Sequence, residues 1–289
     1  ITQHIGAYQI NHNSNKITFI DTPGHAAFTE MRARGSKLTD VVVLVVAADD
    51  GVKPQTVEAI NHSKAAKVPI IVAINKCDLP GSNIEKIKND LMRYELVSED
   101  LSGDTLFVEV SATKKKNLDK LKETILLQAE VLDLKASKTG NAKGVVLEAK
   151  VDKGKGPVAT ILVTGGELKR GDHFICGNAY GKIRAMIEHN GETIENAHPS
   201  SPVEILGLNE KVQAGDEFLV VQNEDEARKI SDFKKSGANE NKASISPDKT
   251  NIFDQENIKK ELNIKSSKIT KINNTSLTTL YVSQSEVSQ

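Results

Sequence analysis

The chain has 289 residues, of which 38% are hydrophobic and 27% charged, a composition typical of one to three globular domains. Its formal net charge of −1 excludes a global attraction to nucleic acid or anionic membranes and leaves room only for a local basic patch. The longest apolar run, residues 41–48, is too short to span a bilayer. The two cysteines, Cys77 and Cys176, form no C-x-x-C motif, so we expect a reducing compartment rather than a disulfide framework.

The first half of the chain is predicted to alternate strands and helices. Two β-type runs at residues 5–10 and 16–21 flank a polar turn, which predicts an antiparallel hairpin. The apolar run 41–48 has no polar face, as expected of a central parallel strand. Further strands are expected at 68–75 and 105–110, and helices at 26–38, 56–66, 84–96 and 118–132. This alternation predicts an α/β domain with a doubly wound, mostly parallel sheet.

The pattern changes after a polar linker. Short β-type runs, separated by glycine-containing turns, replace the helical periods, which predicts a small all-β barrel. The runs cover residues 145–151, 159–163, 173–176, 182–187, 203–208 and 217–221. A charged helix is expected at 224–235, and the Asn-, Lys- and Ser-rich tail beyond it has too few apolar residues to offset its ordering entropy.

We therefore predict four regions along the chain. They are an α/β domain at 1–134, a linker at 135–143, a β-barrel at 144–222, and a charged helix with a poorly ordered tail at 223–289. The sequence begins with Ile rather than Met, so we expect a truncated start, and the lack of a visible targeting signal carries no information.

The first chemical motif is Asp21, Thr22, Pro23, Gly24 and His25, which begins at the last residue of the predicted strand 16–21. An acidic residue and a glycine turn between a strand and a helix can hold a metal and a phosphate at the carboxyl edge of a sheet. Asp21 offers the oxygen ligands that Mg²⁺ prefers, and Gly24 lets a backbone N–H approach a phosphate. The alternative is an ordinary Pro-Gly turn.

The second motif is Asn75, Lys76, Cys77 and Asp78, at the end of the predicted strand 68–75. The Asp carboxylate can accept two donors from a guanine edge, the Asn amide can meet its ring acceptors, and the Lys stem can lie across the base. Such a site rejects a base without the donors by about 10⁴ or more, because buried groups would stay unpaired. The alternative is a turn at a strand end.

Two weaker features complete the set. Ser111 and Ala112 follow the strand 105–110, where small residues let backbone N–H groups approach a base, or where they form only a loop. Thr2 lies 19 residues before Asp21, and its hydroxyl can complete a Mg²⁺ shell, or it is only a frayed terminus.

The order of these motifs resembles the switch and base-recognition motifs of the GTPases. His25 directly after Pro-Gly narrows the resemblance to the translational GTPases. Residues 1–8 and 21–35, together with barrel segments 177–186 and 202–208, are similar to the bacterial-type translation initiation factor 2 family. The resemblance extends from Ile1 to about Lys235.

The resemblance implies the following roles. GTP or GDP would bind with Mg²⁺, which Thr2 and Asp21 would help to hold, Asp21 through water. The Gly24 N–H would meet the γ-phosphate, and His25 would position the attacking water, in a reaction that depends on positioning and charge stabilisation. The motif 75–78 would select guanine, and residues 111–112 would support the base.

The resemblance also implies a function for the whole protein. It would promote initiator tRNA binding to the small ribosomal subunit and subunit joining, with GTP hydrolysis. The barrel would dock on the ribosome, and initiator tRNA would bind through C-terminal domains that this sequence does not contain. We expect a monomer without a membrane partner, located in the cytoplasm or in a mitochondrial or plastid matrix.

The chain departs from the family in three places. No G-x-x-x-x-G-K-[ST] phosphate loop occurs, and the nearest approximation, residues 177–183, falls in the predicted barrel. Thr113 stands where the family more often has Lys, and residues 266–289 are unlike the family. We therefore expect this fragment to be inactive and to bind GTP poorly, and a labelled-GDP titration that gave a micromolar or tighter Kd would contradict this.

Two alternatives stay open. One is a non-catalytic ribosome-binding fragment, which a phosphate loop a few dozen residues before Ile1 would argue against. The other is a different translational GTPase, such as an elongation or selenocysteine-specific factor, against which the context of residues 31–35 argues.

Overall fold

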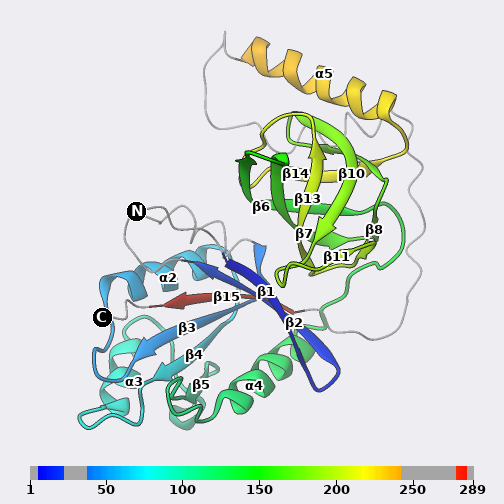
Figure 1. The fold of residues 1–289 in the computed structure, drawn as a ribbon. Coiled ribbons are helices and arrows are strands. Elements are labelled where there is room, and N and C mark those ends of the chain that lie inside the picture. Colours follow the sequence, from blue (N-terminus) through cyan, green and yellow to red (C-terminus); the bar gives the residue numbers. More distant parts are fainter. Residues whose placement is uncertain (1–5, 23–37, 242–277, 285–289) are drawn as a thin grey trace. The chain divides into compact units, whose positions relative to one another are not determined.

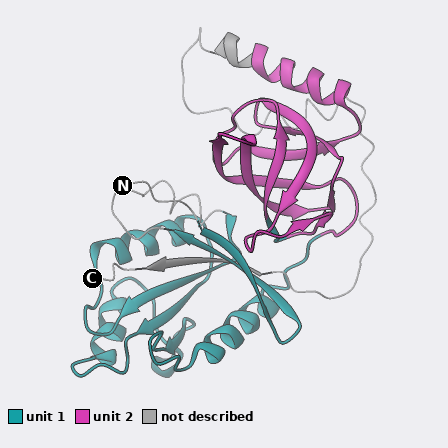
Figure 2. Ribbon diagram, in the orientation of Figure 1, with its two compact units in different colours: residues 1–136, 200–202, 274–289 teal, residues 137–199, 203–273 magenta. Residues whose placement is uncertain are grey.

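The computed structural model describes residues 6–22, 38–241 and 278–284. The chain divides into two compact units, coloured separately in Figure 2. The first comprises residues 1–136 with 200–202 and 274–289, and the second comprises 137–199 with 203–273. The division between residues 136 and 137 falls inside the predicted linker. The exact bounds of the four predicted regions stay predictions.

The first unit contains a six-stranded sheet in the order β1-β2-β15-β3-β4-β5. Its strands are β1 (Gly6–His12), β2 (Asn15–Thr22), β3 (Val41–Ala47), β4 (Ile70–Asn75), β5 (Leu106–Glu109) and β15 (Thr278–Gln284). β1 and β2 form the predicted antiparallel hairpin, whose turn residues Asn13 and Ser14 both have positive φ, as a tight hairpin turn requires. All other neighbouring pairs are parallel.

The sequence predicts a poorly ordered tail at the end of the chain, but the strand β15 lies within it. It lies between β2 and β3, pairing Thr278 with Ile17 on one side and Leu280 with Val41 on the other; Figure 1 shows it in red. Residues 278–282 are β-branched or otherwise strand-favouring, and backbone hydrogen bonds on both sides satisfy the segment. The composition of a long polar tail does not reveal such a short run.

Helices cover both faces of the sheet. They are α2 (Pro54–Ala65), α3 (Ile84–Met92) and α4 (Leu118–Val131), with a short 3₁₀ turn at Glu99–Leu101. Leu44 and Val46 of β3 pack in one cluster with α2 and α3, whereas Val41 and Val43 pack in another with α4. Because side chains alternate along a strand, the all-apolar β3 is buried on both faces, and the doubly wound architecture is confirmed. The predicted helix at 26–38 lies almost wholly outside the described residues.

The second unit is the predicted β-barrel. Its ring runs β10-β13-β7-β6-β14-β9 and closes through a β9–β10 pairing. The strands are β6 (Lys143–Asp152), β7 (Gly156–Gly165), β9 (His173–Cys176), β10 (Ala179–Ile187), β13 (Pro202–Leu208) and β14 (Glu217–Val221), with β8 (Leu168–Lys169), β11 (Thr193–Ile194) and β12 (Asn196–Ala197) as short additions. Closure removes the exposed strand edges that an open sheet would present.

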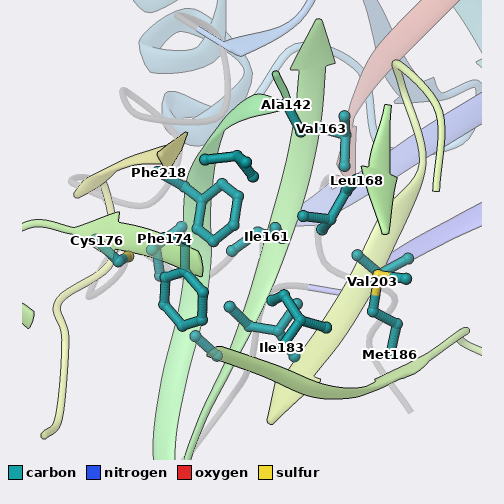
Figure 3. Close-up of a cluster of buried hydrophobic side chains, with 14 of the residues drawn as sticks. Ala142, Ile161, Val163, Leu168, Phe174, Cys176, Ile183, Met186, Val203 and Phe218 are labelled. Carbon is teal, nitrogen blue, oxygen red and sulfur yellow. The ribbon is translucent and has the colours of Figure 1, made fainter. Parts of the chain in front are cut away.

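The barrel is filled by aliphatic and aromatic side chains, shown in Figure 3. The rings of Phe174 and Phe218 lie at its centre, 5.0 Å apart. Gly207 permits a close approach between β13 and β10, since a Cβ there would lie 1.8 Å from the Lys182 carbonyl oxygen. The barrel core contains no tryptophan, because the sequence has none.

The helix α5 (Glu224–Asn241) is longer than predicted. Ala227 and Ile230 pack against Ile175 and Val221, so the charged helix is attached to the barrel by a narrow apolar stripe. Among the described residues, no helix has both the length and the apolar character needed to cross a membrane.

Candidate nucleotide site

The sheet brings the predicted base-recognition residues to one edge. Asn75 is the last residue of β4, and Ser111 lies two residues beyond the end of β5. Backbone hydrogen bonds hold the two strand ends in register, including Val110 N–H to Ile74 C=O at 2.8 Å and Cys77 N–H to Val110 C=O at 3.3 Å. Because the carboxyl ends of parallel strands meet at one edge, side chains 36 residues apart become neighbours.

The side chain of Asn75 is oriented by the next strand's loop. The Ala112 N–H donates to Asn75 Oδ1 at 3.1 Å. Only the oxygen of an amide accepts a hydrogen bond, so this contact fixes which half of the amide faces the loop. The Asn75 NH₂ is left as the half that can donate to a ligand.

Asp78 is held by Ser111. A hydrogen bond from the buried Ser111 side chain lowers the pKa of the exposed Asp78 carboxyl, and the nearby Lys114 and Lys116 lower it further. The Ser111 Oγ also accepts the Lys114 N–H at 3.1 Å. Asp78 is therefore kept ionised, in the state that accepts donors from a ligand.

Lys76 has its backbone and its side chain constrained. Its φ of 61° lies in the left-handed region, which is unusual for a residue other than glycine. Its Nζ lies 3.0 Å from Asp49 Oδ2, in the loop after β3. Cys77, next in the chain, is half-buried.

The end of β2 carries the second half of the predicted site. Burial raises the pKa of the Asp21 carboxyl. The adjacent Thr22 is 1% exposed, and its hydroxyl has no hydrogen-bond partner in the part of the chain that the structure describes. Because side chains alternate along a strand, Asp21 and Thr22 of β2 lie on opposite faces of the sheet, so only the Asp21 carboxylate offers an oxygen ligand to a cation on its face. No group of three or more His, Cys, Asp or Glu side chains arranged for a metal occurs within 6–22, 38–241 and 278–284.

We expect Asp21→Asn to raise the melting temperature at pH 7 by about 1–3 °C, a shift typical of a mild substitution in a chain of this size. A folded-state pKa above the unfolded value means that Asp21 destabilises the fold increasingly as the pH rises from the unfolded pKa, and that this loss is complete above the raised pKa. The gain of the Asn variant should therefore be largest at neutral pH and shrink as the pH falls toward the ordinary Asp value of about 3.9. Differential scanning calorimetry from pH 4 to 8 measures this.

Asp119→Asn is the matched control, because a hydrogen bond with Lys122 lowers the pKa of Asp119 instead. That variant should gain no stability at neutral pH. A loss of stability in Asp21→Asn at pH 7 would mean that the carboxylate has a stabilising partner in the folded chain.

Four predicted residues lie outside the described part of the chain, namely Thr2, Pro23, Gly24 and His25. Conversely, the sequence reasoning missed the contributions of Asp49, Lys114 and Lys116 to this edge. The position of Asp49 directly beyond a buried parallel strand was the available signal, since every such strand end reaches the same edge.

Comparisons with known proteins agree with this architecture. The family model for the elongation factor Tu GTP binding domain matches residues 1–131, and the model for elongation factor G domain 2 matches residues 141–221. A GTP-binding α/β domain followed by this barrel defines the class of translational GTPases.

Curated relatives identify the family within that class. Translation initiation factor IF-2 of Pelagibacter ubique (strain HTCC1062) is 64% identical over 247 residues, covering 86% of this chain and 33% of the relative. The IF-2 proteins of Paramagnetospirillum magneticum (58% identity, 85% of this chain, 28% of the relative) and Clostridium botulinum strain Hall (59%, 81%, 34%) are also similar. The chain belongs to the translation initiation factor IF-2 family, and it spans about a third of the length of these relatives.

Solved structures show the same fold. GDP-bound aIF5B from Aeropyrum pernix superposes with a TM-score of 0.66 at 25% identity, covering 83% of this chain and 52% of that one. A bacterial selenocysteine-specific elongation factor, EF-Sec, gives a TM-score of 0.61 at 23% identity, covering 75% and 38%.

Proposed function

We propose that this chain supplies the guanine-nucleotide domain and the following barrel of a translation initiation factor that binds and hydrolyses GTP. One observation carries the proposal, namely the paired orientation of Asn75 by Ala112 and of Asp78 by Ser111. Both recognition groups accept hydrogen bonds from the loop after β5. The family membership and the GDP named for the aIF5B structure support the same assignment.

The two oriented groups match the hydrogen-bonding edge of guanine. An ionised Asp78 accepts two donors, as the guanine N1–H and exocyclic NH₂ provide. The Asn75 NH₂ donates toward ring acceptors on the other side of the base. Adenine has no donor at N1, so it would leave the carboxylate unpaired, a loss that typically costs several orders of magnitude in affinity.

The phosphate half of the site is proposed from the sequence together with the partial burial of the Asp21 carboxyl. Asp21 and Thr2 would hold Mg²⁺, which when bound would neutralise charge on the phosphate oxygens. The Gly24 N–H would donate to the γ-phosphate, and His25 would position the attacking water. Both steps use placement rather than strong acid or base chemistry.

The proposed partners follow from the family. The barrel would contact the small ribosomal subunit, and initiator tRNA would bind through parts of the protein beyond the length matched here. We further propose a cytoplasmic monomer. A non-catalytic ribosome-binding segment is the alternative that the sequence leaves open.

The test uses a longer form of the chain that carries a phosphate loop ahead of Ile1. Fluorescent GDP is displaced by unlabelled GDP, ADP and inosine diphosphate, and GTP hydrolysis is measured with and without ribosomes. We expect GDP to compete far better than ADP, inosine diphosphate to fall between them because it lacks the exocyclic amine, and ribosomes to stimulate hydrolysis. Equal competition by GDP and ADP would contradict guanine recognition, and binding to ribosomes without hydrolysis would favour the non-catalytic candidate.

A further inference from the structure

The loop after β3 carries two consecutive carboxylates with different partners. Asp49 pairs with Lys76 across 27 residues of sequence at 3.0 Å. Asp50 pairs with Lys53 in its own loop at 3.4 Å. The Asp49 pair joins the ends of two strands, whereas the Asp50 pair is local, so only Asp49 reaches the candidate nucleotide site.

The backbone around the Asp49–Lys76 pair is fixed at both ends. The Ala48 N–H donates to the Asn75 C=O at 2.8 Å, and the Gly51 N–H closes a turn onto the Ala47 C=O at 2.9 Å. Lys76 has its left-handed backbone conformation directly beyond Asn75. The backbone positions from which the two side chains extend are thereby fixed. The side chain of Asp49 is 34% exposed and that of Lys76 is 25% exposed.

We propose that Asp49 is a positioning residue for base recognition, which holds the Lys76 ammonium so that the lysine stem lies ready against the face of the bound guanine. The inference rests on the proposed function of this site. Asp49 itself would not contact the base, because its charge is engaged with Lys76.

The physical reason is the freedom of a lysine side chain. An unanchored stem samples many rotamers, and binding a base against it costs side-chain entropy. A stem fixed at the backbone by an unusual φ and at its tip by an ion pair has already lost that freedom before the ligand arrives, and preorganisation of this kind raises affinity. The hydrogen bond from Lys76 also lowers the pKa of the Asp49 carboxyl, which keeps the anchor ionised.

The competing explanation is that the ion pair merely ties two loops together. A structural tie would act on stability, so its loss in Asp49→Asn or in Lys76→Met would lower the melting temperature together with the GDP affinity. A positioning role predicts instead that Asp49→Asn lowers the GDP affinity while the melting temperature stays near that of the parent, and only while the lysine ammonium is present. A double-mutant cycle with both readouts separates these explanations.

The cycle uses Asp49→Asn, Lys76→Met and the double variant in the longer form with a phosphate loop, with GDP affinity and melting temperature as readouts. Methionine retains an apolar stem without the ammonium. We expect Asp49→Asn to weaken GDP binding by about three- to fivefold, the size of a partly exposed ion pair. In the Lys76→Met background it should have no further effect, and Asp50→Asn, the matched control, should stay within about twofold of the parent.

Several outcomes would overturn the inference. One is an equal loss of affinity from Asp49→Asn in both backgrounds, and another is an equal loss from Asp50→Asn. A large drop in the melting temperature of Asp49→Asn that Lys76→Met reproduces would assign the pair to structure. A form that prefers GDP over ADP but ignores Asp49→Asn would contradict only this inference, whereas a form without guanine preference would contradict the proposed function.

A second measurement uses the 289-residue chain itself and needs no nucleotide. Carbon-13 NMR of the side-chain carboxyls follows the titration of Asp49 in the parent and in Lys76→Met. We expect the Lys76→Met substitution to raise the pKa of Asp49 toward its ordinary value. An Asp49 pKa that does not change would show that the lysine is not held there, and it would overturn the inference even if every variant bound GDP.

Discussion

Replacing Asp78 by Asn is expected to lower the affinity for GDP by about 10³-fold and to create affinity for xanthosine diphosphate. Asp78 is ionised and held by Ser111, so it presents two acceptor oxygens to the two donors of guanine. An asparagine presents one acceptor and one NH₂ group. The NH₂ would face the guanine exocyclic amine, donor against donor, whereas xanthine has a carbonyl oxygen at that position and completes the pair.

The measurement is competition against fluorescent nucleotide in the longer form with a phosphate loop, using GDP, xanthosine diphosphate and ADP. Asp78→Ala is the matched contrast, because it removes both acceptors and provides no donor. It should lose GDP without gaining xanthosine diphosphate. If Asp78→Asn binds GDP within tenfold of the parent, Asp78 does not read the base.

Much of the fold was predictable because the burial of an element determines which of its positions are apolar. The strand β3 (Val41–Ala47) is apolar on both faces, and only a strand covered by helices on both sides can be so. The barrel strands are separated by glycine-containing turns, which marked their ends, but β6 and β7 have 10 residues each and extend beyond the predicted runs 145–151 and 159–163. β15 was not predicted, because its place between β2 and β3 is set by pairing with strands more than 230 residues away.

The sequence indicates candidate residues for the site, which stay predictions, but not the geometry that the structure gives to Asn75 and Asp78. The spacing of Asn75 and Asp78, and their place at a strand end, indicated base recognition. The amide orientation of Asn75 depends on the Ala112 N–H, and the state of Asp78 depends on Ser111, both contributed by the next strand. Asp49 was missed for the same reason, since its partner Lys76 is a neighbour only after β3 and β4 have paired.

Replacing His25 by Ala is expected to lower ribosome-stimulated GTP hydrolysis by about 10²–10³-fold, a size typical of losing one positioning or proton-transferring group. GDP affinity should stay within about twofold of the parent, because the proposed contact of His25 is to the attacking water and not to the nucleotide. Single-turnover hydrolysis on ribosomes, with GDP binding measured in parallel, separates the two effects. His62→Ala, in a histidine paired with Glu58 within α2, is the matched control and should hydrolyse GTP normally.

The nature of the histidine's contribution can be decided by a second substitution. Transfer of a phosphoryl group places most of its demand on alignment and charge stabilisation, and little on a base. A glutamine at position 25 can still donate and accept hydrogen bonds but cannot take up a proton near neutral pH. If His25 positions water, His25→Gln should recover a substantial part of the activity lost in His25→Ala. If His25 removes a proton, both variants should be equally slow, and unchanged turnover in His25→Ala would exclude either role.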